Sequence, residues 1–217
     1  MIPSARSGAP PLPMRRYAVT VIGSGSRDVP ELTRPLGRHL AARGVDLVTG
    51  GGGGVMAGVA RAFVEVRPRD GRSVGILPAD PARPGKPAAG YPNPWIEMAV
   101  PTHLPGRGEE GEGPGSRNHL VVLSGDVIVA LSGGAGTASE LRLAARYGRP
   151  VILLGWTGPP KADTGPTGGE EGAAGTRGGD AGPAEGACDR GQPPRIAASV
   201  PDAIPLLDAL LRETTGT

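Results

Sequence analysis

The 217-residue sequence is poor in several residue types, and each shortage excludes a class of protein. Its one cysteine, Cys188, cannot form an intrachain disulfide, so a reducing compartment is expected and we predict a cytoplasmic protein. No apolar run reaches the about 18 residues that a membrane helix needs, and the N-terminus lacks the apolar region of a signal peptide. The three histidines show no ligand spacing to one another or to the cysteine, so we predict no metal site.

Aromatic residues are also scarce, at 3% of the chain, and lysine occurs only at positions 86 and 161. Arginine supplies most of the positive charge, and residues 1–72 hold 11 arginines against 5 acidic residues. A basic region can attract nucleic acid, which we keep as an alternative function. Single-stranded nucleic acid, however, is usually bound by aromatic side chains between basic ones, and this sequence has few. We therefore expect no nucleic-acid partner, and because no apolar run is long enough to span a bilayer we expect no membrane partner.

Glycine and proline are abundant instead, with 38 and 25 residues. Part of this excess lies in segments that have almost nothing to bury. Residues 1–14 include four prolines, and residues 157–194 contain no Val, Ile, Leu, Met or aromatic residue. Burial in such segments cannot offset the entropy lost on ordering. We predict a disordered arm over 1–14 and a disordered glycine-rich insertion over 157–194.

The rest of the chain alternates short apolar runs with amphipathic segments, which predicts a parallel sheet covered by helices on both faces. Predicted strands span residues 17–22, 45–49, 73–77, 95–100, 127–131 and 151–154, and predicted helices span 30–43, 55–66, 117–123, 138–147 and 201–211. Residues 78–94 and 104–116 are predicted loops. Trp95 is expected to pack inside the protein and His103 to lie on its surface.

Two helix starts carry recognisable polar signals. Asp28 precedes the helix predicted from Pro30 and is a candidate N-cap, while Pro35 is expected to kink or shorten that helix. Thr137 and Glu140 have the spacing of a capping box, which would place Glu140 in the first turn of the helix that follows.

Three predicted strands end in glycine-rich loops, at residues 23–26, 50–54 and 133–137. The carboxyl ends of parallel strands lie at one edge of the sheet, which is the edge where ligands bind in such folds. Glycines let backbone N–H groups approach a ligand, and helix N-termini favour anions. The loops therefore predict a site for a phosphate-bearing ligand. They match neither the dinucleotide pattern G-x-G-x-x-G nor the P-loop pattern, so neither an NAD enzyme nor a P-loop NTPase is supported.

Several ordered motifs resemble a known family. They are GGGGGVMAGVARAF (50–63), VGILP (74–78), VPT (100–102), SRN (116–118), LSGDVIVALSGGAGTASEL (123–141) and GRPVILLG (148–155). With these motifs, residues 15–156 and the last helix resemble the Rossmann-type family that includes the molybdenum cofactor carrier proteins and the LOG-type nucleotide phosphoribohydrolases, once called lysine decarboxylases. The resemblance implies an α/β, Rossmann-like, doubly wound parallel sheet in a single domain formed by residues 15–156 and 195–217.

The resemblance and the glycine loops together assign a set of binding residues. They are Gly23, Ser24, Gly51, Gly52, Gly53, Gly54, Val55, Met56, Arg117, Asn118, Gly133, Gly134, Gly136, Thr137 and Glu140. The apolar surroundings of Met56 favour a core position over a ligand contact. The patterns RN and GTxSE are similar to the carrier branch, and Ser132 stands where the hydrolases have proline. The carrier branch implies a molybdopterin cofactor held as cargo.

The hydrolase branch is the alternative function. It implies cleavage of the N-glycosidic bond of a nucleoside 5′-monophosphate, with Arg117 and Glu140 as the catalytic residues. In either branch the resemblance implies a homodimer or homotetramer.

Overall fold

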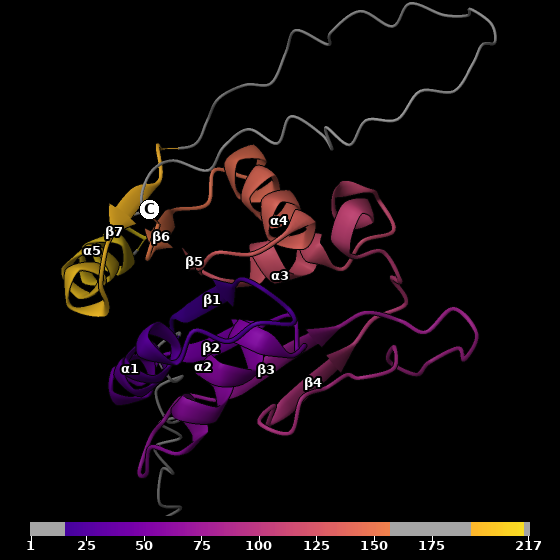
Figure 1. The fold of residues 1–217 in the computed structure, drawn as a ribbon, viewed down its shortest axis with the longest axis horizontal. Coiled ribbons are helices and arrows are strands. Elements are labelled where there is room, and N and C mark those ends of the chain that lie inside the picture. Colours follow the sequence, from indigo (N-terminus) through magenta and orange to yellow (C-terminus); the bar gives the residue numbers. More distant parts are fainter. Residues whose placement is uncertain (1–15, 157–191, 215–217) are drawn as a thin grey trace, which may run out of the picture.

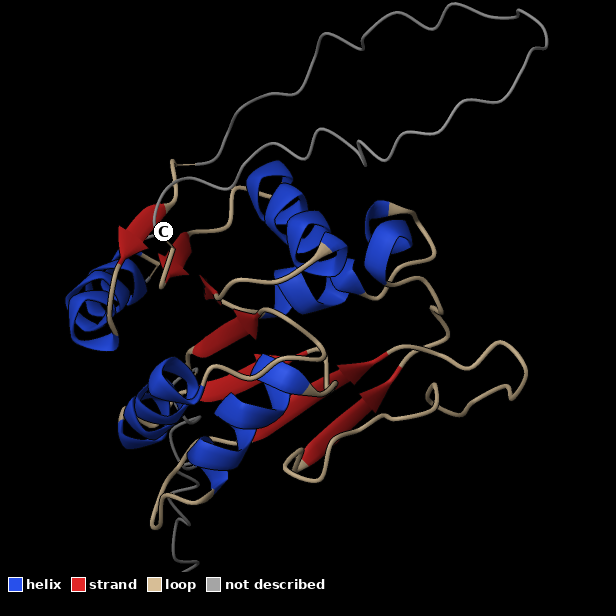
Figure 2. Cartoon of the chain, viewed as in Figure 1, coloured by secondary structure: helices blue, strands red, loops and turns tan. Residues whose placement is uncertain are grey.

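The computed structural model describes residues 16–156 and 192–214 of the chain. Figures 1 and 2 show a central sheet with helices on both sides. The strands are β1 (Ala18–Ile22), β2 (Asp46–Thr49), β3 (Ser73–Leu77), β4 (Met98–Pro101), β5 (Val127–Ala130), β6 (Val151–Leu154) and β7 (Arg195–Ala197). The helices are α1 (Pro30–Ala42), α2 (Gly54–Val64), α3 (Asn118–Ser124), α4 (Ala135–Arg146) and α5 (Val200–Glu213), with a 3₁₀ helix η1 (Gly108–Glu112).

All neighbouring strands pair in parallel, in the order β4-β3-β2-β1-β5-β6-β7. The chain winds outward from β1 to β4 and then returns to place β5 on the other side of β1. Val19 of β1 accordingly has Leu47 of β2 as one neighbour and Val127 of β5 as the other. The winding direction therefore reverses between β1 and β5. The predicted α/β, doubly wound parallel sheet is confirmed.

Alternate side chains of the inner strands fill two apolar cores, one on each face of the sheet, whereas the residues of the edge strand β4 are exposed. On one face Val19 and Val21 of β1 belong to a cluster with residues of α1, α2 and α5. On the other face Ile22 of β1 belongs to a cluster with residues of α3 and α4. Figure 2 shows these two helical layers on either side of the strands. Because both faces are buried, the strand sequences are continuously apolar rather than alternating.

The α1 and α2 helices approach each other closely at a glycine. A Cβ added to Gly37 of α1 would lie 2.5 Å from the carbonyl oxygen of Val59 and 2.9 Å from the Cβ of Ala62 in α2. This contact leaves no room for a side chain. Pro35 lies two residues earlier, and α1 nevertheless continues past it to Ala42.

The predicted cap of α1 is wrong. The N-cap position is occupied by Val29, and no side chain caps this helix. The Asp28 Oδ1 instead accepts hydrogen bonds from the Val29 N–H and the Thr33 hydroxyl, each at 2.8 Å. Asp28 also fills the space beside Gly58, where an added Cβ would lie 2.2 Å from its carboxylate. The carboxylate therefore connects the loop after β1 to α1 by hydrogen bonds and packs against α2 at Gly58.

The predicted capping box at α4 is wrong as well. This helix begins three residues earlier than expected, with Gly134 as an N-cap that carries no side-chain hydrogen bond. Glu140 consequently lies in the second turn, and Thr137 lies over Gly133, where an added Cβ would meet its hydroxyl at 2.1 Å. A capping box does occur at α5, where the Ser199 hydroxyl accepts from the N–H of Asp202.

Two short elements were not predicted, and two predicted segments stay untested. The 3₁₀ helix η1 lies within the predicted loop 104–116, and β7 follows the predicted insertion directly. The arm predicted over 1–14 lies outside the described residues, as does the insertion over 157–194 except for residues 192–194. Within the two described ranges, no helix is both long and apolar enough to cross a bilayer.

Gly37→Ala tests the close approach of α1 and α2. We expect it to lower the free energy of unfolding by about 1–3 kcal/mol because the new methyl group overpacks the contact, although alanine favours helix more than glycine does. Arg38→Ala, which removes the next, exposed side chain, is the control and should change stability by less than about 0.5 kcal/mol. Denaturant unfolding followed by circular dichroism measures both. A Gly37→Ala protein as stable as the wild type would contradict the contact.

Candidate functional site

The three glycine loops follow β1, β2 and β5, which are neighbours at the centre of the sheet, and they meet at its carboxyl edge (Figure 1). Ser24, in the loop after β1, joins the other two. Its N–H donates to the carbonyl of Ser132 at 3.2 Å, and its carbonyl accepts from the N–H of Val55 at 2.9 Å. The site therefore lies where the winding direction reverses, and its loops are held together by backbone hydrogen bonds.

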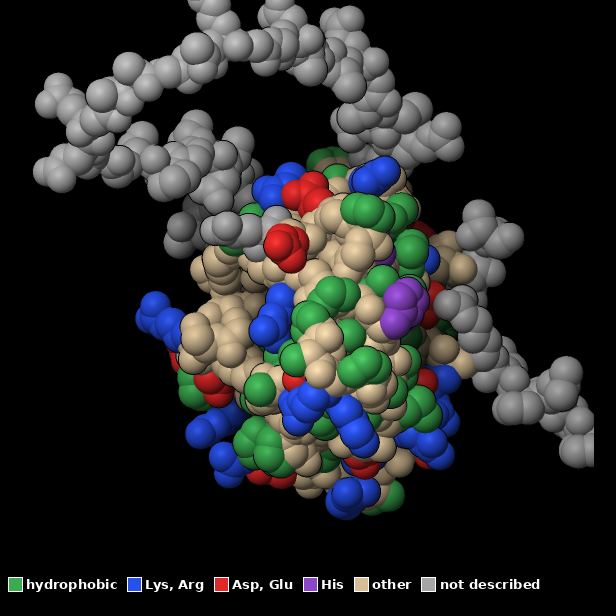
Figure 3. All heavy atoms as spheres, turned by 90° about the vertical axis from the view of Figure 1, so that its right-hand side faces the viewer, with side chains coloured by type: hydrophobic (Ala, Val, Ile, Leu, Met, Phe, Trp, Pro, Cys, Tyr) green, Lys and Arg blue, Asp and Glu red, His purple; other side chains and the backbone are tan. Residues whose placement is uncertain are grey.

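A cavity of about 440 Å³ opens between these loops and the segment that precedes η1. Its lining residues are Gly23, Ser24, Gly25, Ser26, Met56, Tyr91, Arg107, Gly108, Arg117, Asn118, Gly134, Gly136, Thr137 and Glu140. Figure 3 views this side of the molecule, where backbone, small polar and hydrophobic atoms predominate and blue basic side chains lie among them. The volume falls within the range of sites for small ligands.

Two helices begin at the site without a side-chain cap. The N-cap residues are Gly53 for α2 and Gly134 for α4, and neither helix has a side-chain hydrogen bond that caps it. The first N–H groups of a helix carry partial positive charge and need acceptors. At α2 the N–H of Val55 already donates to the carbonyl of Ser24. The start of α4 lines the cavity, so an anion there can supply acceptors to its N–H groups and a phosphate group is favoured.

Arg117 lines the cavity and carries a buried positive charge. Its side chain is buried, its Nη2 donates to the carbonyl of Gly50 at 3.3 Å, and its Nη1 donates to the side chain of Asn118. Its Nε is buried without a hydrogen-bond partner among the described residues. A Cβ on Gly50 would lie only 2.5 Å from Nη2, so glycine is required there for the guanidinium to fit. Arg117 also lines the cavity, so its positive charge can attract an anion bound there.

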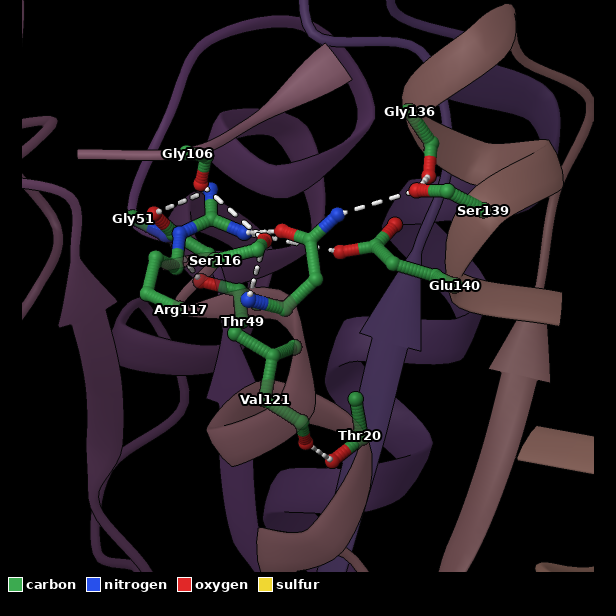
Figure 4. A network of polar contacts seen from close by, with 12 residues as sticks. Thr20, Thr49, Gly51, Gly106, Ser116, Arg117, Val121, Gly136, Ser139 and Glu140 are labelled. Atoms are coloured by element: carbon green, nitrogen blue, oxygen red, sulfur yellow. Dashed lines mark hydrogen bonds and ion pairs between the residues drawn. The ribbon is translucent and has the colours of Figure 1, made fainter. Parts of the chain in front are cut away.

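Glu140 forms an ion pair with Arg117 in the wall of the cavity, with its Oε1 3.6 Å from Nη1 (Figure 4). Burial raises the pKa of Glu140 to about 7, and the nearby Arg117 cation offsets that effect only in part. The carboxyl group is therefore divided between its neutral and charged forms near pH 7. In the neutral form it can donate a hydrogen bond to an anion, and in the charged form it repels one.

A polar network connects these residues across the fold (Figure 4). The Asn118 side chain donates to the Ser139 hydroxyl at 3.1 Å, and that hydroxyl donates to the carbonyl of Gly136 at 2.8 Å. The Ser116 hydroxyl accepts from the Asn118 N–H and donates to the carbonyl of Gly106. The motifs SRN and GTASE, which are more than ten residues apart in sequence, thus form one hydrogen-bonded unit.

Nine of the predicted binding residues line this cavity. They are Gly23, Ser24, Met56, Arg117, Asn118, Gly134, Gly136, Thr137 and Glu140. Gly133 lines two neighbouring cavities instead. Gly51, Gly52, Gly53 and Gly54 form the adjoining loop and helix start without lining it, and Val55 is fully buried against Gly23. Sequence reasoning missed Tyr91 and Arg107, because they lie in segments without periodic patterns.

The two neighbouring cavities are not lined by the Arg117–Glu140 ion pair. One, of about 370 Å³, is lined by Ser24, Arg27, Val29, Ser132 and Gly133. The other, of about 600 Å³, runs along another face of α4 towards Trp156. Arginines line both of them, but neither is lined by Arg117 or Glu140, so the buried charged pair belongs to the cavity described above alone among the three. In the described part of the chain no cluster of His, Cys, Asp and Glu could hold a metal ion.

Comparisons with known proteins agree with this fold. A model of the SLOG cluster4 family matches residues 16–171. An uncharacterised protein of Archaeoglobus fulgidus is 28% identical over 143 residues, which cover 65% of this chain and 82% of that protein. The structure of the molybdenum cofactor binding protein from Rippkaea orientalis is 30% identical, covers 65% of this chain and 78% of that one, and has a TM-score of 0.50.

The Moco carrier protein from Chlamydomonas reinhardtii shares the fold over a longer stretch. It is 22% identical, and the match covers 92% of this chain and 99% of that chain with a TM-score of 0.57.

The raised pKa of Glu140 predicts a pH dependence of stability. Its carboxyl group has a pKa of about 7 in the folded protein against an ordinary value of 4.5, so it binds more protons when folded. Its contribution to stability is therefore present at low pH and is lost as pH rises through 7. Between pH 5 and pH 8, the free energy of unfolding of the wild type should fall by about 2–3 kcal/mol relative to Glu140→Gln.

Denaturant unfolding of both proteins at several pH values measures this difference. Other titrating groups are common to the two proteins, so their effects cancel, and so does any constant cost of the substitution. Parallel stability profiles for wild type and Glu140→Gln would show that the carboxyl group titrates normally.

Proposed function

The chain belongs to the SLOG cluster4 family, and from this premise we propose that it binds a phosphate-bearing, nucleotide-like ligand. The ligand we propose is the molybdenum cofactor, which combines a pterin ring system with a phosphate and would be held as cargo. The similar protein from Rippkaea orientalis is a molybdenum cofactor binding protein, and the one from Chlamydomonas reinhardtii is a Moco carrier protein. Both similarities support this choice of ligand.

The observation that carries the proposal is the buried guanidinium of Arg117 in the wall of the cavity. A buried cation is costly unless it is paired, and its acidic neighbour Glu140 is only partly charged near pH 7, so an anionic ligand would complete the pairing. Phosphate oxygens match arginine geometry and are strong acceptors. The start of α4, which has no side-chain cap, opens onto the same cavity and favours the same charge.

Hydrolysis of a nucleoside 5′-monophosphate is the alternative, and one observation favours it. Arg117 and Glu140 line one cavity, so a phosphate bound by the first would bring the sugar near the second. The charged form of Glu140 could then stabilise positive charge that develops on the sugar. This reaction leaves a product, free base, that a carrier does not form.

The homodimer or homotetramer implied by the family resemblance stays a prediction, because the structure contains one chain. Native mass spectrometry of the purified protein gives the number of subunits. The same measurement reports the mass of any ligand that the protein retains.

Binding measurements with the purified chain test the proposed function. We expect the wild type to bind molybdenum cofactor freshly released from a molybdoenzyme, under anaerobic conditions, and to protect it from decay. Arg117→Lys keeps the positive charge but loses the planar fork of donors, so the affinity should fall about tenfold. Arg61→Lys is the control, because Arg61 is exposed on α2 and pairs with Glu65 outside the cavity.

The outcomes separate the two functions. Failure of the wild type to bind the cofactor, AMP or inorganic phosphate would overturn the proposal. Release of adenine from AMP, abolished by Glu140→Gln, would establish the hydrolase instead. Equal loss of affinity in Arg117→Lys and Arg61→Lys would show that Arg117 is not the phosphate ligand.

A further inference from the structure

Three residues of the cavity have no part in binding a phosphate at the glycine loops. Met56 comes from α2, Tyr91 from the loop after β3, and Arg107 from the segment before η1. They bring a thioether, an aromatic ring and a cation to a cavity whose other walls are largely glycine, serine and the Arg117–Glu140 pair. The chain has only three tyrosines in 217 residues, and one of them lines this cavity.

Tyr91 and Met56 both lie beside Gly52, in the glycine loop that follows β2. A Cβ added to Gly52 would lie 2.8 Å from the Met56 methyl group, and 3.3 and 3.4 Å from the ring carbon Cε1 and the hydroxyl of Tyr91. The same methyl group would lie 3.7 Å from a Cβ on Gly25, in the loop after β1. The two side chains therefore form one apolar surface directly beside the loops that we assign to the phosphate.

The loop that carries Tyr91 is held at the glycine loop by Asn93. The N–H of Asn93 donates to the carbonyl of Gly51, and its side-chain amide donates to the carbonyl of Gly52, both at 2.8 Å. Asn93 is buried, although the surrounding residues 78–94 form a proline-rich loop. Two hydrogen bonds between segments 41 residues apart thus fix the position of the tyrosine relative to the glycine loop.

The guanidinium of Arg107 lies over the ring of Tyr91. The guanidinium carbon lies 5.6 Å from the ring centroid, a distance typical of a cation–π contact. The next residue, Gly108, lies 3.6 Å from the position of a Cβ on Gly136 in α4. The cavity is therefore bounded at this end by residues from both halves of the sheet.

We propose that Tyr91, Met56 and Arg107 form a subsite that receives a planar heterocycle, a purine or a pterin, of the phosphate-bearing ligand. A flat ring lies well against an aromatic face and a methionine methyl group, and a guanidinium can stack on such a ring. This subsite makes the protein select ring-bearing phosphates over sugar phosphates. The inference rests on the proposed function, because it requires the phosphate at the glycine loops.

The test compares ligands that share a phosphate but differ in the ring. The probes are AMP, a pterin phosphate ester and ribose 5-phosphate, each titrated calorimetrically into the full chain. For the wild type we expect at least one ring-bearing ligand to bind at least tenfold more tightly than ribose 5-phosphate. In Tyr91→Leu this preference should fall about tenfold, while the affinity for ribose 5-phosphate stays within twofold. Tyr91→Phe keeps the ring and should retain the preference.

A general structural disturbance would change the affinity for all three ligands alike, whereas the subsite predicts a change in their ratio. A wild type that prefers neither ring-bearing ligand overturns the subsite, and so does a Tyr91→Leu protein that retains the full preference. Equal weakening of all three ligands in Tyr91→Leu also overturns it. If the wild type binds none of the three probes and no molybdenum cofactor, the proposed function itself fails, and the subsite fails with it.

Discussion

The buried guanidinium of Arg117 is the interaction on which the site depends. It bonds to the loop after β2 on one side and faces Glu140 of α4 on the other, so it joins the two halves of a doubly wound sheet. Its presence explains why Gly50 has no side chain and why Glu140 is held next to a cation. It also explains the placement of Asn118, which bonds to Arg117 and to α4 at once. A buried charge of this kind needs several partners, and the surrounding motifs supply them.

The fold could be predicted from sequence because its signals are local. Apolar runs of strand length define β1, β5 and β6, and the glycines after three strands point to the ligand-binding edge. The start of α4 could not be predicted in this way. Glycines at 133, 134 and 136 indicate a loop, yet Gly136 is helical, and the backbone of α4 there lies close to Gly108 of η1. That contact comes from a segment far away in sequence and leaves no periodic signal.

The position of Tyr91 at the cavity could not be predicted from the sequence either. Nothing near Tyr91 in the sequence indicates a site, because its loop is rich in proline and has no regular spacing of apolar residues. Only the hydrogen bonds from Asn93 to Gly51 and Gly52 place it there. The family resemblance carried by short motifs, by contrast, brought Arg117 and Glu140 together as candidates, and both line the cavity. Contacts between distant loops thus set the shape of the cavity, whereas short motifs set its charge.

The bonds made by Asn93 have a further consequence for the dynamics of the protein. The carbonyls of Gly51 and Gly52 lose their hydrogen-bond donors if the loop around Tyr91 lifts away, so each segment resists opening only while the other is in place. The two segments therefore form one cooperative unit of local unfolding. In a hydrogen-exchange experiment their backbone amides would exchange together, and a ligand that contacts either segment would slow exchange in both.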